Sequence, residues 1–197
     1  SPLVDGDLVF VNSNSSSGRI AAFRSTDGHE MWRGFPNDQL THATPVLATM
    51  AGVRQLVFFT NPNLIGVQPE TGAELWRYRI TTANSSSMAA SPVVGSDIVY
   101  FSASYATGAG GVAISTNTSG GLAATQKWKL QVGGIMNHWS TPVHHNGHLY
   151  GIYGDWSTGI LKCVDLATGL QVEDWGGPDI DSGGILKVGA HLLVLTS

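Results

Sequence analysis

One short phrase recurs along the chain, and its spacing constrains the fold more than any other feature of the sequence. In this phrase a small residue precedes a proline and an apolar pair, and copies begin at Ser1, Thr44, Ser91 and Thr141. Successive copies lie about 40 to 50 residues apart, a period typical of stacked structural repeats. The segment from Ile185 to Leu193 continues the pattern without the proline. The sequence therefore predicts four repeated units and the opening strands of a fifth.

A second phrase closes each unit and combines a glycine turn with a tryptophan. Residues 26–32 and 70–76 match one another, and a degraded copy lies in the third unit. A fourth copy contains Gly169, but its tryptophan, Trp175, falls two positions late. Three tryptophans recur at matching positions of the first three units, so we expect them to pack between units rather than to bind a cofactor. These residues are Trp32, Trp76 and Trp128.

Each unit contains four alternating apolar runs separated by turn-forming residues, which predicts four antiparallel strands. In the first unit the runs are Pro2–Asp5, Leu8–Asn12, Ile20–Arg24 and Glu30–Gly34. Four strands repeated every 40 to 50 residues or so are typical of a β-propeller blade. We therefore expect a single all-β domain, a partial β-propeller of four-stranded antiparallel blades. The blades cover roughly 1–40, 41–87, 88–137 and 138–181, with an incomplete fifth over 182–197. Extra residues around Asn117–Ala124 predict a longer hairpin in the third blade.

The closing phrase resembles the docking motif of the PQQ-like (pyrroloquinoline quinone repeat) propeller family, Ala-x-Asp-x-x-Thr-Gly-x-x-x-Trp. Residues 163–169 follow this motif closely. Residues 22–32 follow it with Arg24 in place of the aspartate and Asp27 in place of the threonine, and residues 66–76 follow it with Gln68 in place of the aspartate. The resemblance covers essentially the whole chain. It implies a ring of seven or eight blades, completed by missing chain or by a second copy. It also implies a periplasmic or secreted location.

Charge and apolar patterning exclude several classes of partner. The net charge is −4 and no basic run occurs, so the sequence lacks the electrostatic footprint of a nucleic-acid-binding protein. No apolar stretch approaches the roughly 18 residues of a membrane span. The single cysteine, Cys163, cannot form an internal disulfide and could give a metal site only one thiolate.

Candidate ligand-binding residues gather on one predicted face, where the crossings between blades meet the loops that join second to third strands. We call this the top face. Residues 41–45, 88–92 and 138–142 are equivalent crossings, so His42 and Trp139 share a slot beside a central channel. Function concentrates on such loops when the scaffold is rigid. The candidates are His42, Tyr105, Asn137, His138, Trp139, Asp155 and Trp156. Alternatively, these side chains plug the channel and cap hairpins.

Titratable residues elsewhere favour no metal or catalytic site. The histidines of residues 144–148 surround Asn146-Gly147, which predicts a tight, solvated turn on the opposite, bottom face rather than a metal cluster. The carboxylates placed on the top face are Asp38, Asp155, Asp179 and Asp181. No glutamate is among them, and no nucleophile elbow or phosphate loop occurs.

Two functions are compatible with this sequence. The first hypothesis is a non-catalytic scaffold that needs no cofactor and binds a protein or a small ligand on the top face. The second is a periplasmic quinoprotein dehydrogenase that oxidises an alcohol or a sugar with PQQ and calcium. Such an enzyme needs a carboxylate base, oxygen ligands for calcium and a flat aromatic clamp. The few top-face carboxylates favour the scaffold.

Overall fold

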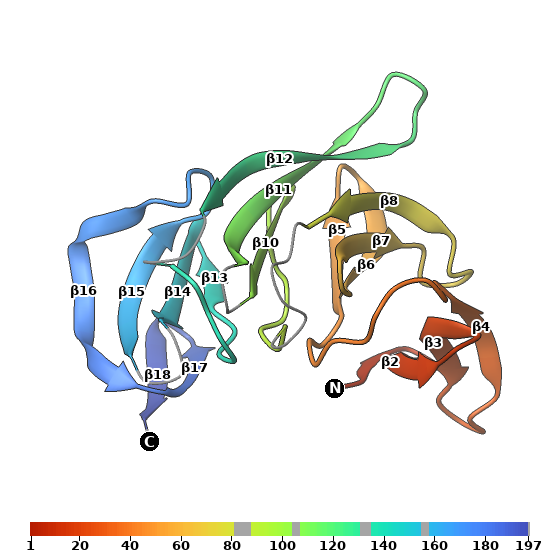
Figure 1. The fold of residues 1–197 in the computed structure, drawn as a ribbon, viewed down its shortest axis with the longest axis horizontal. Coiled ribbons are helices and arrows are strands. Elements are labelled where there is room, and N and C mark those ends of the chain that lie inside the picture. Colours follow the sequence, from red (N-terminus) through yellow and green to blue (C-terminus); the bar gives the residue numbers. More distant parts are fainter. Residues whose placement is uncertain (81–87, 104–106, 131–134, 155–157, 197) are drawn as a thin grey trace.

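The computed structural model of the chain describes residues 1–80, 88–103, 107–130, 135–154 and 158–196. Within these residues all regular structure is β-sheet, arranged as four four-stranded sheets and one two-stranded sheet. Within each sheet, strands that are consecutive in sequence pair antiparallel, and the sheets stack side by side along an arc (Figure 1). Over the described residues, nothing forms a helix that is long and apolar enough to cross a membrane.

We call the four-stranded sheets blades 1 to 4. Blade 1 contains β1 (Leu3–Asp5), β2 (Leu8–Ser15), β3 (Gly18–Arg24) and β4 (Glu30–Gly34). Blade 2 contains β5 (Val46–Met50), β6 (Val53–Phe59), β7 (Asn63–Val67) and β8 (Glu74–Arg79). Blade 3 contains β9 (Val93–Gly95), β10 (Ile98–Ala103), β11 (Gly108–Thr116) and β12 (Leu122–Leu130). Blade 4 contains β13 (Val143–His145), β14 (His148–Tyr153), β15 (Gly159–Asp165) and β16 (Gln171–Asp181). The last sheet contains β17 (Gly183–Val188) and β18 (His191–Thr196).

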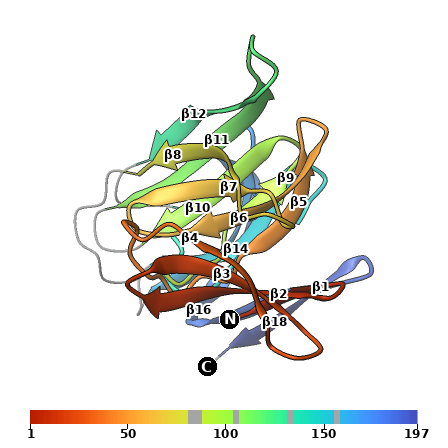
Figure 2. The same cartoon turned by 90° about the vertical axis from the view of Figure 1, so that its right-hand side faces the viewer.

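These strands confirm the predicted all-β architecture. The four strands expected in blade 1 are present, although β2 runs past Asn12 to Ser15 and so takes up most of the expected loop. The longer hairpin expected in blade 3 is also present, with its turn between Thr116 and Leu122. β11 and β12 carry this hairpin well beyond the other sheets, as Figures 1 and 2 both show.

Apolar side chains from facing sheets form one buried cluster at each junction between blades. Blades 1 and 2 enclose a cluster that includes Phe10 and Phe58, and blades 2 and 3 enclose a larger one that includes Phe59 and Phe101. The third cluster lies between blades 3 and 4 and includes Tyr100. Burial of apolar area at these junctions is the main force that holds one sheet against the next.

The first strands of successive sheets are neighbours, and their hydroxyl residues explain the recurring proline phrase. The backbone N–H of Thr44 donates to Ser91 Oγ at 3.0 Å, and the N–H of Ser91 donates to Thr141 Oγ1 at 2.9 Å. Each residue stands directly before the proline of its own phrase. The small hydroxyl residue therefore links blade 2 to blade 3 and blade 3 to blade 4.

The glycine turn of one blade receives the tryptophan of the blade before it. Trp32 Nε1 donates to the carbonyl of Pro69 at 2.8 Å, and Trp128 Nε1 donates to the carbonyl of Leu166 at 2.9 Å. A Cβ atom at Gly72 would lie 2.6 Å from the Trp32 ring, and Gly72 has a φ of +73°. Glycine is required there because the turn is left-handed and the indole lies against it.

Trp76 is the exception among the three tryptophans. It is buried in the cluster between blades 2 and 3, as expected, but its indole N–H donates to Gln55 Oε1 of its own blade. Blade 3 has its long hairpin where the glycine turn would receive this indole. Leu122 and Ala124 of that hairpin pack against the cluster instead, and Tyr78 Oη donates to Gln126 Oε1 at 3.0 Å.

Trp175 returns to the repeated position through an irregular strand pairing. β15 and β16 shift register between Lys162 and Val164, whose partners are Gly176 and Gln171. The Trp175 ring packs edge-on against Tyr150, with ring centroids 5.3 Å apart, and the equivalent pair in blade 3, Trp128 and Tyr100, is tilted with centroids 6.2 Å apart. The extra residues that displace Trp175 in the sequence are absorbed by this bulge.

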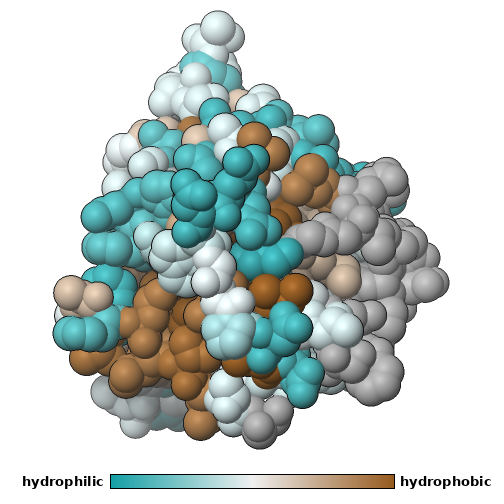
Figure 3. All heavy atoms as spheres, turned by 90° about the vertical axis from the view of Figure 1, so that its left-hand side faces the viewer, coloured by the Kyte–Doolittle hydropathy of each residue, from teal (hydrophilic) through white to brown (hydrophobic). Residues whose placement is uncertain are grey.

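The β17–β18 sheet differs from the blades because one of its faces is exposed and apolar. Figure 3 shows the apolar surface on this side of the molecule. The exposed residues of this sheet include Leu186, Val188, Leu193 and Leu195. Leu186 pairs directly with Leu193 across the two strands.

Candidate functional site

The structure brings the crossings and the second-to-third-strand turns together, as the sequence predicts. Gln39, in the crossing from blade 1 to blade 2, exchanges backbone hydrogen bonds with Asn61 of the β6–β7 turn at 2.8 and 3.1 Å. In blade 4 the N–H of Gly154 donates to the carbonyl of Met136, in the crossing from blade 3, at 2.7 Å. Three of the candidate site residues, Tyr105, Asp155 and Trp156, lie outside the described residues.

Asn137 is a structural residue that ties blade 3 to blade 4. Its side chain is fully buried, its Nδ2 donates to the carbonyl of Ile152 at 2.6 Å, and its Oδ1 accepts a hydrogen bond from Tyr100 Oη at 2.5 Å. Its backbone N–H donates to Ser102 Oγ at 2.7 Å. Burial raises the pKa of Tyr100 well above its ordinary value, so this phenol stays protonated and donates.

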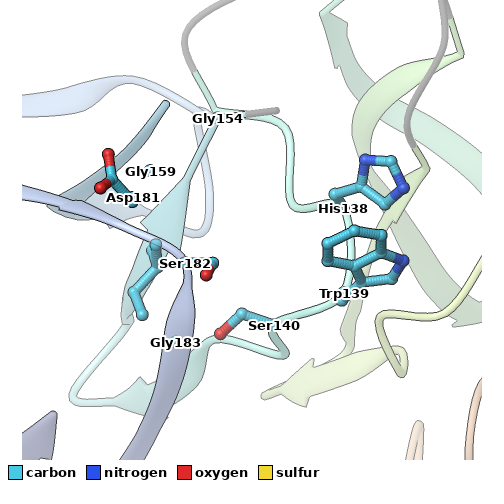
Figure 4. Close-up of a pocket in the computed structure, with 9 residues that line it drawn as sticks. His138, Trp139, Ser140, Gly154, Gly159, Asp181, Ser182 and Gly183 are labelled. Atoms are coloured by element: carbon cyan, nitrogen blue, oxygen red, sulfur yellow. The ribbon is translucent and has the colours of Figure 1, made fainter. Parts of the chain in front are cut away.

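His138 and Trp139 are adjacent in sequence but differ in environment. His138 is buried, with only 4% of its surface exposed, whereas Trp139 is 56% exposed. Their rings lie against each other, with centroids 4.1 Å apart (Figure 4). Trp139 therefore presents an apolar surface to solvent from a backbone that Asn137 fixes on one side and Thr141 on the other.

His42 is exposed on the equivalent crossing, two residues before Thr44, as Trp139 is two residues before Thr141. Its backbone N–H donates to the carbonyl of Met88 at 3.1 Å, which connects this crossing to the next. Leu40, on the same crossing, is 42% exposed. Sequence reasoning missed Leu40, although its place in the crossing was a signal that could have found it.

A small pocket lies between the crossing of His138 and the start of β17. It has room of about 40 Å³, which holds one or two water molecules. Figure 4 shows Ser140 and Asp181 beside it, while the His138 ring points away from Asp181. A serine, a histidine and an aspartate thus meet here without the arrangement of a catalytic triad. The lining residues are His138, Trp139, Ser140, Ile152, Gly154, Gly159, Asp181, Ser182 and Gly183.

Asp38, one of the carboxylates expected on the top face, is buried and fully engaged. Arg77 lies 3.1 Å from its Oδ2, and Thr60 Oγ1 and Asn63 Nδ2 both donate to its Oδ1. Its backbone carbonyl accepts a hydrogen bond from Arg19 at 3.0 Å. A carboxylate held in this way links blade 1 to blade 2 and is not available as a general base.

The residues described here do not fit a quinone site with calcium. Across the described ranges, no group of three or more His, Cys, Asp or Glu side chains is placed to hold a metal ion. The pocket beside Trp139 is far smaller than the roughly 300 Å³ at which small-molecule sites begin. Asn137 and Asp38, which could have offered oxygen ligands, are bound within the protein.

The histidine-rich hairpin of β13 and β14 forms the predicted tight turn, since Asn146 and Gly147 both have positive φ values, of 49° and 79°. His145 is exposed, as expected. The expectation of a solvated turn is wrong for His144, whose Nε2 atom is buried. Local sequence does not indicate this burial, because the side chain is covered by Gly95 of blade 3, which is remote in the chain.

Comparisons with known proteins agree with this architecture. The model of the family PQQ_2, described as outer membrane protein assembly factor BamB, matches residues 1–173. The crystal structure of BamB from Moraxella catarrhalis superposes with a TM-score of 0.68 at 19% identity. This match covers 99% of the chain and 57% of the BamB chain. No curated protein matches the sequence. The family match covers most of the chain, which therefore belongs to the BamB-type family of PQQ-like β-propellers.

Proposed function

We propose that the chain is part of a non-catalytic scaffold that binds a protein partner on its top face during outer-membrane protein assembly. The observation that carries this proposal is the contrast on that face between engaged polar groups and an exposed tryptophan. The side chains of Asn137 and Asp38 are hydrogen-bonded within the protein, whereas Trp139 is 56% exposed. The name of the matching family supports the role in assembly.

Trp139 is the side chain best suited to anchor a protein. Tryptophan is enriched among the residues that contribute most to binding, because it offers a large, rigid apolar surface. Leu40 adds a second exposed apolar side chain to the crossings. The pocket beside Trp139 is too small for most organic ligands, which favours a protein over a small molecule as the partner. A periplasmic location and the absence of a cofactor follow from this proposal.

The quinoprotein alternative makes a different prediction for the same residue. Under that alternative, Trp139 would stack on PQQ, and calcium would be needed for binding. Titration of the full-length protein with PQQ and calcium, followed by tryptophan fluorescence, separates the two functions. Saturable, calcium-dependent quenching that disappears in Trp139→Ala would contradict the scaffold proposal.

The scaffold proposal is tested by measuring affinity for purified outer-membrane assembly proteins of the same source. Trp139→Ala is expected to weaken binding by about tenfold or more, the loss typical of an aromatic anchor. Leu170→Ala is the matched control, because Leu170 is 64% exposed but lies in the β15–β16 turn, on the bottom face. Equal affinities for the wild-type protein and the Trp139→Ala variant would show that Trp139 does not contribute to partner binding.

A further inference from the structure

His144 lies at the junction between blades 3 and 4, where β13 packs against β9. Its Nε2 atom is within 2.5 Å of the position that a Cβ atom would take on Gly95 of β9. Leu166 covers the same glycine from the end of blade 4's third strand. The Nε2 atom is buried and has no hydrogen-bond partner among the residues that the structure describes. The imidazole therefore fits this junction through contact with backbone and apolar atoms.

Carboxylates on the surrounding elements are engaged elsewhere. Asp97, which follows β9, accepts a hydrogen bond from the N–H of Ala51 in blade 2 at 2.6 Å. Asp165, at the end of β15, accepts hydrogen bonds from the N–H and Oγ1 of Thr168, both at 2.8 Å. The remaining titratable groups on the elements packed against His144 are the basic residues His145, His148 and Lys187 and the phenols of Tyr150 and Tyr153 on β14. Burial raises the pKa values of both phenols, so they stay uncharged in the range where histidine titrates.

Protonation of His144 would introduce two unfavourable features at once. In the protonated ring both nitrogens carry hydrogen, so the buried Nε2 would be a donor without an acceptor among the described residues, and the ring would carry a positive charge near other basic groups. Burying an unpaired charge or an unsatisfied donor destabilises a folded protein. We propose that His144 makes the junction between blades 3 and 4 acid-sensitive, so that the propeller loosens there when this imidazole is protonated.

The direction of the pH dependence follows from the environment of the ring. Burial lowers the pKa of His144 below its ordinary value of 6.5, and the charges of His145 and His148 lower it further. Between the two pKa values, the unfolded chain binds a proton that the folded chain does not bind. Stability contributed by this site is therefore complete above about pH 6.5 and is lost as the pH falls below that value.

Thermal unfolding of the full-length protein at about pH 7.5 and about pH 5.5 tests the proposal, because histidine changes charge in this range. The variant is His144→Gln, which has no charge at either pH. The matched control is His145→Gln, the exposed neighbour. From the higher pH to the lower, the midpoint temperature of the wild-type protein should fall by about 2–4 °C more than that of His144→Gln. His145→Gln should keep most of the wild-type dependence.

A second measurement applies even when His144→Gln does not fold. An NMR titration of the histidine rings in the unmodified protein should place the His144 pKa below 6.5. A pKa at or above that value would overturn the proposal. So would a loss of midpoint temperature in His144→Gln that equals the loss in the wild-type protein.

Discussion

The junctions on either side of blade 3 hold their tryptophans in different ways. Between blades 3 and 4, the Trp128 indole donates to the backbone carbonyl of Leu166 and lies against Gly169. Between blades 2 and 3, the Trp76 indole turns back to the Gln55 side chain of its own blade. The recurring tryptophan is thus packed into both junctions, but of these two residues it is Trp128 that donates a hydrogen bond across its junction.

The difference shows that a docking motif needs two blades. Trp76 closes the same repeated phrase as Trp32, with the glycine, glutamate and tryptophan at matching positions, so the phrase of blade 2 itself is suited to dock. The next blade decides the outcome, because blade 3 replaces the glycine turn with the long β11–β12 hairpin. A buried indole N–H must find an acceptor. Gln55, fully buried beneath it, supplies one from within blade 2.

The strongest way to break the junction between blades 3 and 4 is Gly169→Ala. Gly169 has a φ of +74°, and an added Cβ atom would lie 2.6 Å from the Trp128 ring. Left-handed strain and overpacking together should lower the free energy of unfolding by about 3 kcal/mol. Urea unfolding of the full-length protein measures this loss.

Gly120→Ala is the matched control for that variant. Gly120 has a φ of +82° at the tip of the β11–β12 hairpin, and no atom lies within 4 Å of the added Cβ position. Only the backbone strain remains, so the expected loss is about 1 kcal/mol. Equal losses for the two variants would show that contact between Gly169 and Trp128 contributes nothing to the junction.

At the junction between blades 2 and 3, the corresponding change is Gln55→Leu. It removes the acceptor of the Trp76 indole and the donor to the carbonyls of Met50 and Val53. Leaving these buried groups unsatisfied should cost about 2 kcal/mol in unfolding free energy. The cost should fall when Trp76→Phe is already present, because the indole donor is then gone.

Gln126→Leu is the control for Gln55→Leu. Gln126 accepts a hydrogen bond from Tyr78 at 3.0 Å, but it is exposed. Water can satisfy the groups left behind, so the expected change is within about 0.5 kcal/mol. A similarly small effect of Gln55→Leu would mean that the Trp76 indole finds another acceptor.

Local sequence was enough to predict the blades, because strand periodicity and turns depend on neighbouring residues. The partners of the tryptophans were not predictable in the same way. Pro69 and Leu166 accept through backbone carbonyls, which leave no signature in the sequence. The position of Trp175, two residues late in the repeat, also suggested that it would not pack like the other repeated tryptophans. A bulge between β15 and β16 restores its contact with Tyr150.

The candidate site was predicted in part. The sequence predicted that Asn137 and Trp139 are both candidate ligand-binding residues of one crossing, and the structure shows that the two residues differ. Asn137 is buried beneath the crossing, while Trp139 is exposed on it. Which residue of a crossing turns inward depends on acceptors such as the carbonyl of Ile152, which lies in the next blade. Repeat alignment alone does not contain that information.

The smallest predicted effect concerns a contact that the two junctions share. Ser91 Oγ accepts the N–H of Thr44, and the same residue donates its own N–H to Thr141, so it lies at the centre of the link from blade 2 to blade 4. Ser91→Ala removes only the first of these bonds. The expected loss is about 1 kcal/mol, because the Thr44 N–H is left partly buried without its acceptor. Ser115→Ala, at an exposed serine of β11, is the control and should change the free energy of unfolding in urea by less than about 0.5 kcal/mol.

The double variant of Ser91→Ala and Gly169→Ala tests whether the two junctions are independent. Because the Thr44 N–H has no role in the tryptophan contacts, the two losses of unfolding free energy should add. A deviation from additivity would show that the two junctions are coupled through blade 3.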